Sequence, residues 1–351
     1  MRPIIRYLSF VFVVSAFASC KNGTLFTPVS SGRPYEMLVV VDKDTWERPA
    51  GRALFDVLDT DVPGLPQSER SFRISNTDPS QFDRILRIFR NIILVDIKDT
   101  YTHPQLKYSR DVYAQPQMIM RIQAPNEKEF EEFVTKSKQT IIDFFVKAEM
   151  NRQINVLREN HSGVVGRKVD SLFGCRLWVP VELASYKVGE DFFWASTNVA
   201  TSDMNIVVYS YPYVDRNTFT RDYFIQKRDS TMKANLPGAR EGMYMMTDTL
   251  YVETKDIVVH KNYAQEARGL WAMKGDMMGG PFVSHSRVDR KNGRVIVAEA
   301  FIFSPDKLKR NLIRTMEASL YTLQLPEEIK EETEIPVEGA EETEMEKASD
   351  K

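Results

Sequence analysis

The strongest constraint on the fold lies in the second half of the chain, where apolar segments of strand length follow one another closely. After Gly174 these segments are RLWVPV, DFFWAST, MNIVVYSYPY, MYMMTD, TLYVETKDIVVH, ARGLWAMKG, PFVSHSRV and RVIVAEAFIF. The last two are joined by Lys291-Asn292-Gly293-Arg294, and an Asn-Gly pair supplies the positive φ angles of a type I′ hairpin turn. The succession predicts a β-rich half with mainly antiparallel strands.

The first half mixes strand and helix signals. Residues 35–44 (YEMLVVVDKD) predict a buried strand, and residues 126–160 predict the clearest helix of the chain. Asn126 can cap this helix, because Glu129 stands three residues later in a capping-box arrangement. Near the end of the chain another helix should follow Ser304 as its cap, with a proline in the first helical position. We expect an α+β fold of mainly antiparallel sheets with helices packed on one face, which could comprise two related α+β halves.

The first twenty residues carry a targeting signal with two alternative cleavage sites. Arg2 and Arg6 precede an apolar stretch over residues 7–18, which is shorter than the ~20 residues that span a membrane. A cut after Ala18 would release an ordinary exported protein, whereas a cut before Cys20 would leave that cysteine at the mature N-terminus. We favour the second cut, because only two cysteines occur in the whole chain and one stands directly after such a site.

The segment Phe17-Ala18-Ser19-Cys20 resembles the lipobox of bacterial lipoproteins of the Bacteroidetes type. The resemblance implies a signal peptide over residues 1–19, and a diacylglyceryl group together with an acyl chain such as palmitate on Cys20. Residues 20–33 are rich in Gly, Ser, Thr and Pro and predict a tether. No Asp follows Cys20, so the resemblance implies attachment to the outer membrane on the side that faces the periplasm.

Charge is unevenly spread along the chain. Residues 327–351 hold eleven acidic and three basic residues, a net charge of −8, which leaves +6 on residues 1–326. The acidic segment has few apolar residues and predicts a disordered tail. A positive charge of this size is too small for a dedicated nucleic-acid-binding protein. The expected partner is therefore the membrane, through lipidated Cys20, with an envelope protein or glycan as a further partner and no nucleic acid.

The familiar catalytic and metal-binding motifs do not occur in the sequence. We find no His-Glu-x-x-His, Gly-x-Ser-x-Gly, Walker A, Gly-x-Gly-x-x-Gly or Cys-x-x-Cys. The four histidines show no metal-ligand spacing, and Cys175 lies among apolar residues, as an inert buried thiol would. We expect no cofactor and no metal site, and the catalytic residues of any reaction stay unknown.

One segment combines residue types that are common in binding sites, ARGLWAMKGDMMGGPFVSHSR (267–287). Trp, Arg and Phe are frequent in binding sites, and paired glycines allow close approach of the backbone. The candidate ligand-binding residues are Arg268, Trp271, Met278, Gly279, Gly280 and Phe282. The alternative is a tight turn between two buried strands.

This segment, together with SFRISNTDPSQF, KANLPG and FSPDKLKRNLIRTMEASL, resembles an uncharacterised Bacteroidetes lipoprotein family, a domain of unknown function. The likeness extends over residues 33–325, and the family implies no activity and no catalytic residues. We expect a lipid-anchored envelope protein with a binding or structural role. The alternative is a periplasmic hydrolase that acts on an envelope polymer through carboxylates. Carboxylates with raised pKa values near residues 267–287 would favour the enzyme, and an apolar groove would favour binding.

The predicted division of the chain has five parts. They are the signal peptide (1–19), the tether (20–33), an N-terminal α+β half (34–160), a C-terminal β-rich α+β half (161–326) and the acidic tail (327–351).

Overall fold

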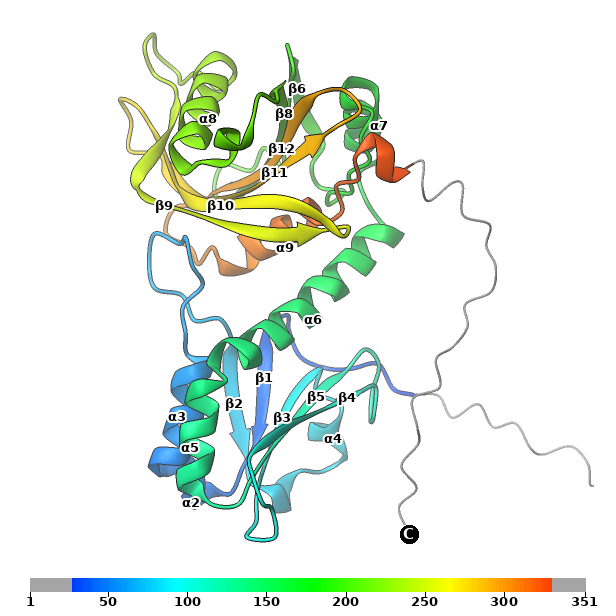
Figure 1. Cartoon of the computed structure of the whole chain (residues 1–351), viewed down its shortest axis with the longest axis vertical. Helices are drawn as coiled ribbons and strands as arrows, with labels where there is room; N and C mark the ends of the chain where they lie inside the picture. Colours follow the sequence, from blue (N-terminus) through cyan, green and yellow to red (C-terminus); the bar gives the residue numbers. More distant parts are fainter. Residues whose placement is uncertain (1–26, 330–351) are drawn as a thin grey trace, which may run out of the picture.

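The computed structural model describes residues 27–329. They form two lobes, each built on its own β-sheet, and helix α6 (Lys138–Glu159) runs from one lobe to the other (Figure 1). None of the helices among these residues combines the length and the hydrophobicity of a membrane-spanning helix. Several predicted features lie outside the described residues: the signal peptide (1–19), Cys20, the first half of the tether (20–33) and nearly all of the acidic tail (327–351).

The N-terminal lobe holds a five-stranded sheet in the order β2-β1-β3-β5-β4. Its strands are β1 (Glu36–Val40), β2 (Arg73–Thr77), β3 (Asn91–Ile97), β4 (Gln105–Arg110) and β5 (Met118–Ala124). Its helices are α2 (Lys43–Glu47), α3 (Pro49–Leu58), α4 (Arg84–Arg87), α5 (Glu127–Lys136) and the first part of α6. Alternate side chains of β1 face opposite sides, so that Met37 and Val39 join the core under α3, α5 and α6, while Leu38 and Val40 pack beside α4.

The C-terminal lobe holds a seven-stranded sheet in the order β6-β7-β8-β12-β11-β10-β9. Its strands are β6 (Ser185–Gly189), β7 (Phe192–Ser196), β8 (Asp203–Pro212), β9 (Met245–Val259), β10 (Asn262–Met273), β11 (Gly279–Asp289) and β12 (Arg294–Phe303). Its helices are α7 (Gly163–Phe173), α8 (Arg221–Asn235) and α9 (Arg310–Leu320). All six strand pairings of this sheet are antiparallel.

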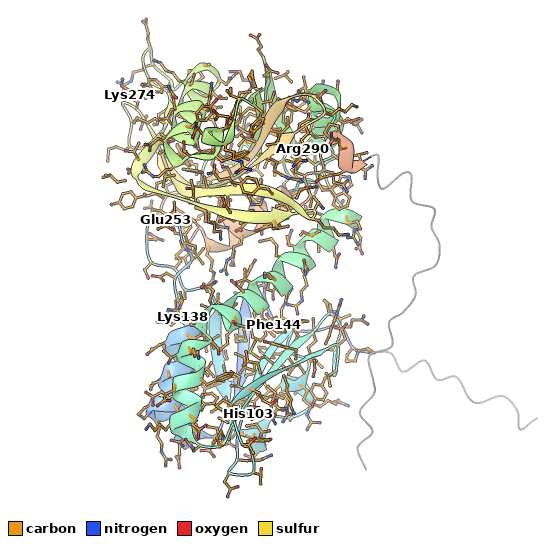
Figure 2. All side chains as sticks on the ribbon, in the orientation of Figure 1. His103, Lys138, Phe144, Glu253, Lys274 and Arg290 are labelled. Atoms are coloured by element: carbon orange, nitrogen blue, oxygen red, sulfur yellow. The ribbon has the colours of Figure 1, made fainter. Side chains whose placement is uncertain are left out.

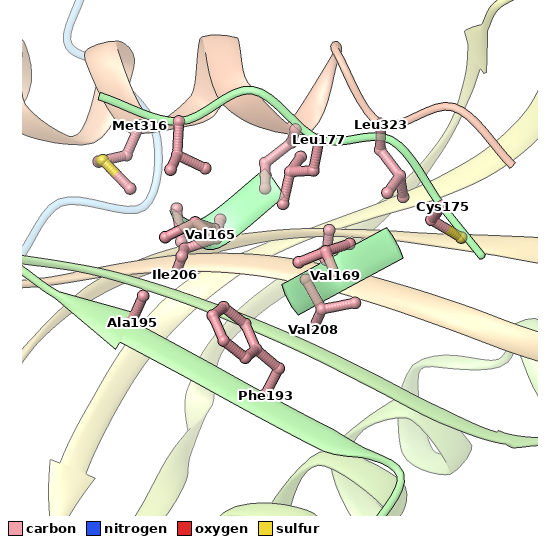
Figure 3. Close-up of a cluster of buried hydrophobic side chains, with 14 of the residues drawn as sticks. Val165, Val169, Cys175, Leu177, Phe193, Ala195, Ile206, Val208, Met316 and Leu323 are labelled. Carbon is pink, nitrogen blue, oxygen red and sulfur yellow. The ribbon is translucent and has the colours of Figure 1, made fainter. Parts of the chain in front are cut away.

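A cluster of mostly aliphatic side chains fills one face of the larger sheet, beneath α7 and α9. Val165 and Val169 of α7 meet Ile206 and Val208 of β8 there (Figure 3). Cys175 lies in the same cluster, and burial raises the pKa of its thiol to about 12. The opposite face is covered by α8 and holds a second core. Helices thus cover both faces of this sheet, where one face was expected, because the strands are apolar on both sides.

The α+β class is confirmed, and so is the antiparallel pairing of the C-terminal half. In the N-terminal sheet, by contrast, three of the four pairings between the described strands are parallel. Parallel neighbours need a long crossover, and α2 with α3 provides one between β1 and β2. The two lobes therefore differ in strand order and in strand direction.

The long predicted helix is divided at Ser137 into α5 and α6. The bend lets α5 lie along α3, while α6 continues toward α9 (Figure 1). Phe144 on α6 (Figure 2) stacks its ring 4.6 Å from that of Tyr108 on β4. One helix thus contributes to the core of the N-terminal lobe and spans the distance to the other lobe.

The predicted hairpin at Lys291–Arg294 is present, but its turn type was wrong. Asp289 and Arg294 are paired, so the loop has four residues, and within it a positive φ occurs at Gly293 (62°) and not at Asn292. The carboxylate of Asp289 accepts hydrogen bonds from Asn292 Nδ2 at 2.7 Å and Arg294 Nε at 2.9 Å. These bonds hold a longer loop than a type I′ turn allows.

The predicted start of α9 was also wrong, because this helix begins at Arg310 and Ser304 does not cap it. The cap comes from the other lobe, through the loop 59–72 that joins α3 to β2 (Figure 1). The carboxylate of Glu69 accepts the backbone N–H of Lys309 at 2.8 and 3.0 Å and that of Arg310 at 2.8 Å. An acceptor from far along the chain thus replaces the local one.

A second buried contact joins the lobes next to this cap. Arg314 of α9 donates a hydrogen bond to the carbonyl oxygen of Ser71 at 2.7 Å. Its guanidinium lies 4.1 Å from the centre of the Tyr35 ring, at cation–π distance. The two lobes are therefore held together by specific side-chain contacts as well as by the chain that connects them.

Candidate functional site

The candidate residues of segment 267–287 do not form one site. Arg268 and Trp271 lie on opposite faces of β10, because side chains alternate along a strand. Trp271 is buried under α8 and donates from Nε1 to the carbonyl oxygen of Ile302 at 3.1 Å. Phe282 lies in the same core, with the guanidinium of Arg228 4.2 Å from its ring centre. Met278 is partly exposed, just ahead of β11.

The two glycines start β11 and lie beside Trp271. Trp271 is the register partner of Gly280. A Cβ atom on Gly280 would come 2.0 Å from the carbonyl oxygen of Ile302, and one on Gly279 would come 2.8 Å from that of Trp271. Close approach of backbone to backbone explains both glycines. Trp271, Gly279, Gly280 and Phe282 are thus brought together, while Arg268 points to the other face.

Arg268 belongs to a cavity between the two lobes. The cavity has a volume of about 720 Å³ and is lined by α6, β9, β10, α9 and the loop 59–72. Interfaces between domains are common positions for ligand sites. On the α6 side the wall carries an apolar stripe, because Ile142, Val146, Met150 and Ile154 stand at helical spacing. Polar side chains of the same helix flank this stripe: Gln139, Asp143, Lys147 and Asn151.

On the opposite side the cavity has a floor of paired charges, here called the charged cluster: Lys255, Glu266, Arg268 and Glu317. Arg268 donates to Glu266 from Nε at 2.5 Å and from Nη2 at 3.0 Å, and it donates to both carboxylate oxygens of Glu317. Lys255 Nζ lies 3.0 Å from Glu266. One guanidinium therefore binds a carboxylate of its own strand and one of α9.

His285 extends the charged cluster inward. Its Nε2 lies 3.8 Å from a carboxylate oxygen of Glu266, and its ring meets that of Tyr321 edge to face at 4.7 Å. Burial alone would raise the pKa of Glu266, but His285, Arg268 and Lys255 together hold it well below its ordinary value. Glu266 is thus a fixed anion at neutral pH, which does not suit a proton donor in catalysis.

Arg314 is a buried cation at the same cavity. Its guanidinium donates to Ser71, and within residues 27–329 no carboxylate lies at ion-pair distance from it. Burial lowers the pKa of Arg314. A buried guanidinium that has no ion pair among the described residues, beside a cavity with an apolar stripe, provides a place for a ligand with one apolar part and one anionic or hydrogen-bond-accepting group.

The sequence pointed to Arg268 alone among these residues. Glu266 and Arg268, two positions apart, share one face of β10, and Arg314 and Glu317 share one face of α9. These patterns of charge within apolar elements were the available signal. The lobe-to-lobe contact that makes them neighbours could not be seen in either element.

A smaller cavity, of about 460 Å³, lies at the carboxyl ends of β1 and β3. The chain continues from β1 to β2 on one side and later returns to β3 on the other, and ligands of open α/β sheets bind at such points. Asp96 there accepts from Tyr101 at 2.6 Å and Gln123 at 3.2 Å and pairs with Lys98 at 3.0 Å. Burial opposes ionisation, but these hydrogen bonds outweigh it and lower the pKa of Asp96 to about 2.

The comparisons with known proteins divide at the same place as the lobes. Residues 30–158 match the family model of one domain of unknown function (DUF8532), and residues 163–322 match another (DUF4837). No curated protein matches the chain. The chain therefore contains two domains of unknown function. The Bacteroidetes origin and the lipid anchor stay predictions from the sequence.

Proposed function

We propose that the chain is a lipid-anchored cell-envelope protein whose two lobes bind a small amphipathic ligand between them. The observation that carries the binding role is the cavity of about 720 Å³, with an apolar stripe on α6 and the buried Arg314 on the facing side. Within residues 27–329 no carboxylate lies at ion-pair distance from Arg314. The ligand would place its apolar part against Val146 and Met150 and its anionic or accepting group toward Arg314. The anchor is supported by the lipobox-like segment that ends at Cys20.

We prefer a binding role to a hydrolase because of the ionisation state of Glu266. A hydrolase that uses two carboxylates needs one of them protonated at working pH. Glu266, the carboxylate beside Arg268, has a lowered pKa instead. The charged cluster then serves to fix the position of β10 against α9 and to give the cavity a polar floor.

The ligand site is tested with anilinonaphthalene sulfonate, a fluorescent probe that has an aromatic body and one anionic group. We expect its fluorescence to rise on binding to the chain of residues 20–351 with Cys20→Ser, which keeps every described residue and carries no acyl chain. Val146→Trp fills the cavity and should remove most of this rise. The matched control is Val164→Trp on α7, where the valine is exposed. Equal fluorescence from the two variants would contradict the proposal.

The anchor is tested separately, by the intact mass of the full-length protein recovered from membranes. We expect a mass that begins at Cys20 and includes acyl chains, and we expect this species to be lost in Cys20→Ser. An unmodified chain that begins at Ser19 would mean cleavage after Ala18 and would exclude the anchor. Separation of inner and outer membranes then tests the proposed location on the outer membrane, facing the periplasm.

A further inference from the structure

A third cavity lies on the side of α6 that faces β4 and the amino ends of β3 and β5. Its volume is about 480 Å³. Four cationic side chains line it together with one acidic side chain, Glu159, and the set of cations is Arg90, Arg110, Lys147 and Arg152. The rim also has apolar side chains, among them Phe144, which is marked in Figure 2. We call this the cationic pocket.

A buried carboxylate fixes two of the four cations. Glu149 lies behind the pocket, pairs with Arg90 Nη2 at 2.9 Å and with Arg152 Nη1 at 2.7 Å, and accepts from Asn91 Nδ2 at 2.6 Å. Arg152 also donates to Asn91 and to the carbonyl oxygen of Arg90. The two guanidinium groups are therefore held in place before any ligand arrives, which lowers the entropy cost of binding.

Several donors around the pocket are not used within the described residues. Arg90 Nε is buried and has no hydrogen-bond partner there. Arg110 is 73% exposed and pairs with Asp111 through Nε at 3.2 Å, which leaves both of its terminal nitrogens available. Lys147 is exposed and forms no ion pair within residues 27–329. After Glu149, Glu159 and Asp111 are counted, the group still carries one positive charge.

The start of the described chain runs along the edge of this pocket. Ser31 donates its N–H to the carbonyl of Ile88 at 2.8 Å and accepts the N–H of Arg90 at 3.0 Å, and Ser30 donates to the carbonyl of Gln115 at 3.1 Å. Thr27 stands seven positions after Cys20, and seven residues span at most about 25 Å. If Cys20 is anchored, as proposed above, the cationic pocket is held close to the membrane surface.

We infer that the cationic pocket binds a phosphate-bearing ligand. Arginine and lysine donors around one cavity suit the oxygens of a phosphate, and Phe144 at the rim suits an apolar part attached to it. The same chemistry is present in the headgroup of an anionic phospholipid and in a soluble phosphate ester. The charge of the pocket does not depend on the proposed anchor, whereas its nearness to the membrane does.

Isothermal titration calorimetry with glycerol phosphate tests the soluble source. Co-sedimentation with vesicles of phosphatidylcholine, with and without phosphatidylglycerol, tests the lipid source. Both use the chain of residues 20–351 with Cys20→Ser, so that no acyl chain contributes. Arg110→Gln removes two unused donors and should weaken binding roughly tenfold. The matched control is Lys107→Gln, because Lys107 is on the opposite face of the same strand and should change binding by less than about twofold.

Binding of glycerol phosphate that depends on Arg110 would assign the pocket to a soluble phosphate. Sedimentation that requires phosphatidylglycerol and depends on Arg110 would assign it to a lipid headgroup. Absence of Arg110-dependent binding in both assays, or an equal loss in Lys107→Gln, would overturn the inference. Val146→Trp fills only the cavity between the lobes and should leave phosphate binding unchanged, so that failure of that proposed site can be told from failure of this one.

Discussion

At the scale of single residues, the contact between Trp271 and Gly280 shows how small side chains set the spacing of the larger sheet. The indole of Trp271 reaches the carbonyl of Ile302 across the position of Gly280. Any side chain on Gly280 would meet that carbonyl first. The packing of β10, β11 and β12 therefore requires a glycine at position 280, independently of any binding role of segment 267–287.

Gly280→Ala should therefore destabilise the protein by about 2–4 kcal/mol, since overpacking at backbone contact cannot be relieved by rotation of a side chain. Urea denaturation would measure the change. The matched control is Gly166→Ala in α7, where the new Cβ would have an ordinary contact of 3.6 Å. This substitution should stabilise the helix by about 0.5–1 kcal/mol. Equal stability of Gly280→Ala and the wild type would contradict the role given to this glycine.

Asp96 gives a pH-dependent prediction at the same scale. The pKa of its carboxyl falls from 3.8 to about 2 in the folded protein, so the ionised form stabilises the fold above pH 3.8, and this stabilisation is lost as the pH falls through about 2. Near neutral pH, Asp96→Asn should lower the free energy of unfolding by about 1–2 kcal/mol.

The measurement is the free energy of unfolding of wild type and Asp96→Asn across the acid range. The difference between the two proteins should shrink between pH 3.8 and 2. Asp56→Asn, at an exposed position of α3, should give little difference at any pH. A difference between wild type and Asp96→Asn that stays constant with pH would assign the effect to packing instead of charge.

At the scale of elements, Glu69 and α9 form the contact on which the arrangement of the lobes depends. The first turn of a helix has unpaired N–H groups and a positive end of the helix dipole, and the carboxylate of Glu69 satisfies both while 5% exposed. The loop 59–72 is thus attached to α3 at its start and held near its end by the contact of Glu69 with α9.

Glu69→Ala should lower the free energy of unfolding by about 1–2 kcal/mol, as loss of a helix cap does. The stability of Glu69→Gln should lie between those of Glu69→Ala and the wild type, because glutamine keeps one acceptor oxygen. Hydrogen exchange should become faster at the start of α9 in Glu69→Ala. The exposed glutamate Glu241→Ala serves as the control. Unchanged exchange in α9 would show that another group satisfies these amides.

The same contact explains how far sequence reasoning extends. Strands of the second half were visible because each is apolar and bounded by turn residues, and the cap of α5 was visible because Asn126 and Glu129 are neighbours in the chain. The cap of α9 was not visible, since 240 positions separate Glu69 from Lys309. Arg268 was selected together with Trp271 because they are close in sequence, yet alternation along β10 separates them. Contacts that depend on the meeting of two lobes leave no local pattern.

At the scale of the whole molecule, the two lobes should unfold together. Glu69, Arg314 and α6 connect them through buried contacts, so opening of one lobe exposes polar groups of the other. Scanning calorimetry of the chain of residues 20–351 should show one transition with equal calorimetric and van't Hoff enthalpies. Two resolved transitions in the wild type would mean that the contacts between lobes contribute little.

Because Glu69 caps α9 from the other lobe, the order of synthesis affects when this contact can form. A ribosome makes Glu69 long before it makes Lys309, so the N-terminal lobe is synthesised first. The first lobe can therefore be folded when α9 is synthesised. A chain cut short before α9 would leave the Glu69 carboxylate without its amides, and a C-terminal lobe made alone would leave those amides without their carboxylate. The contact between the lobes can therefore be completed only after α9 has been synthesised.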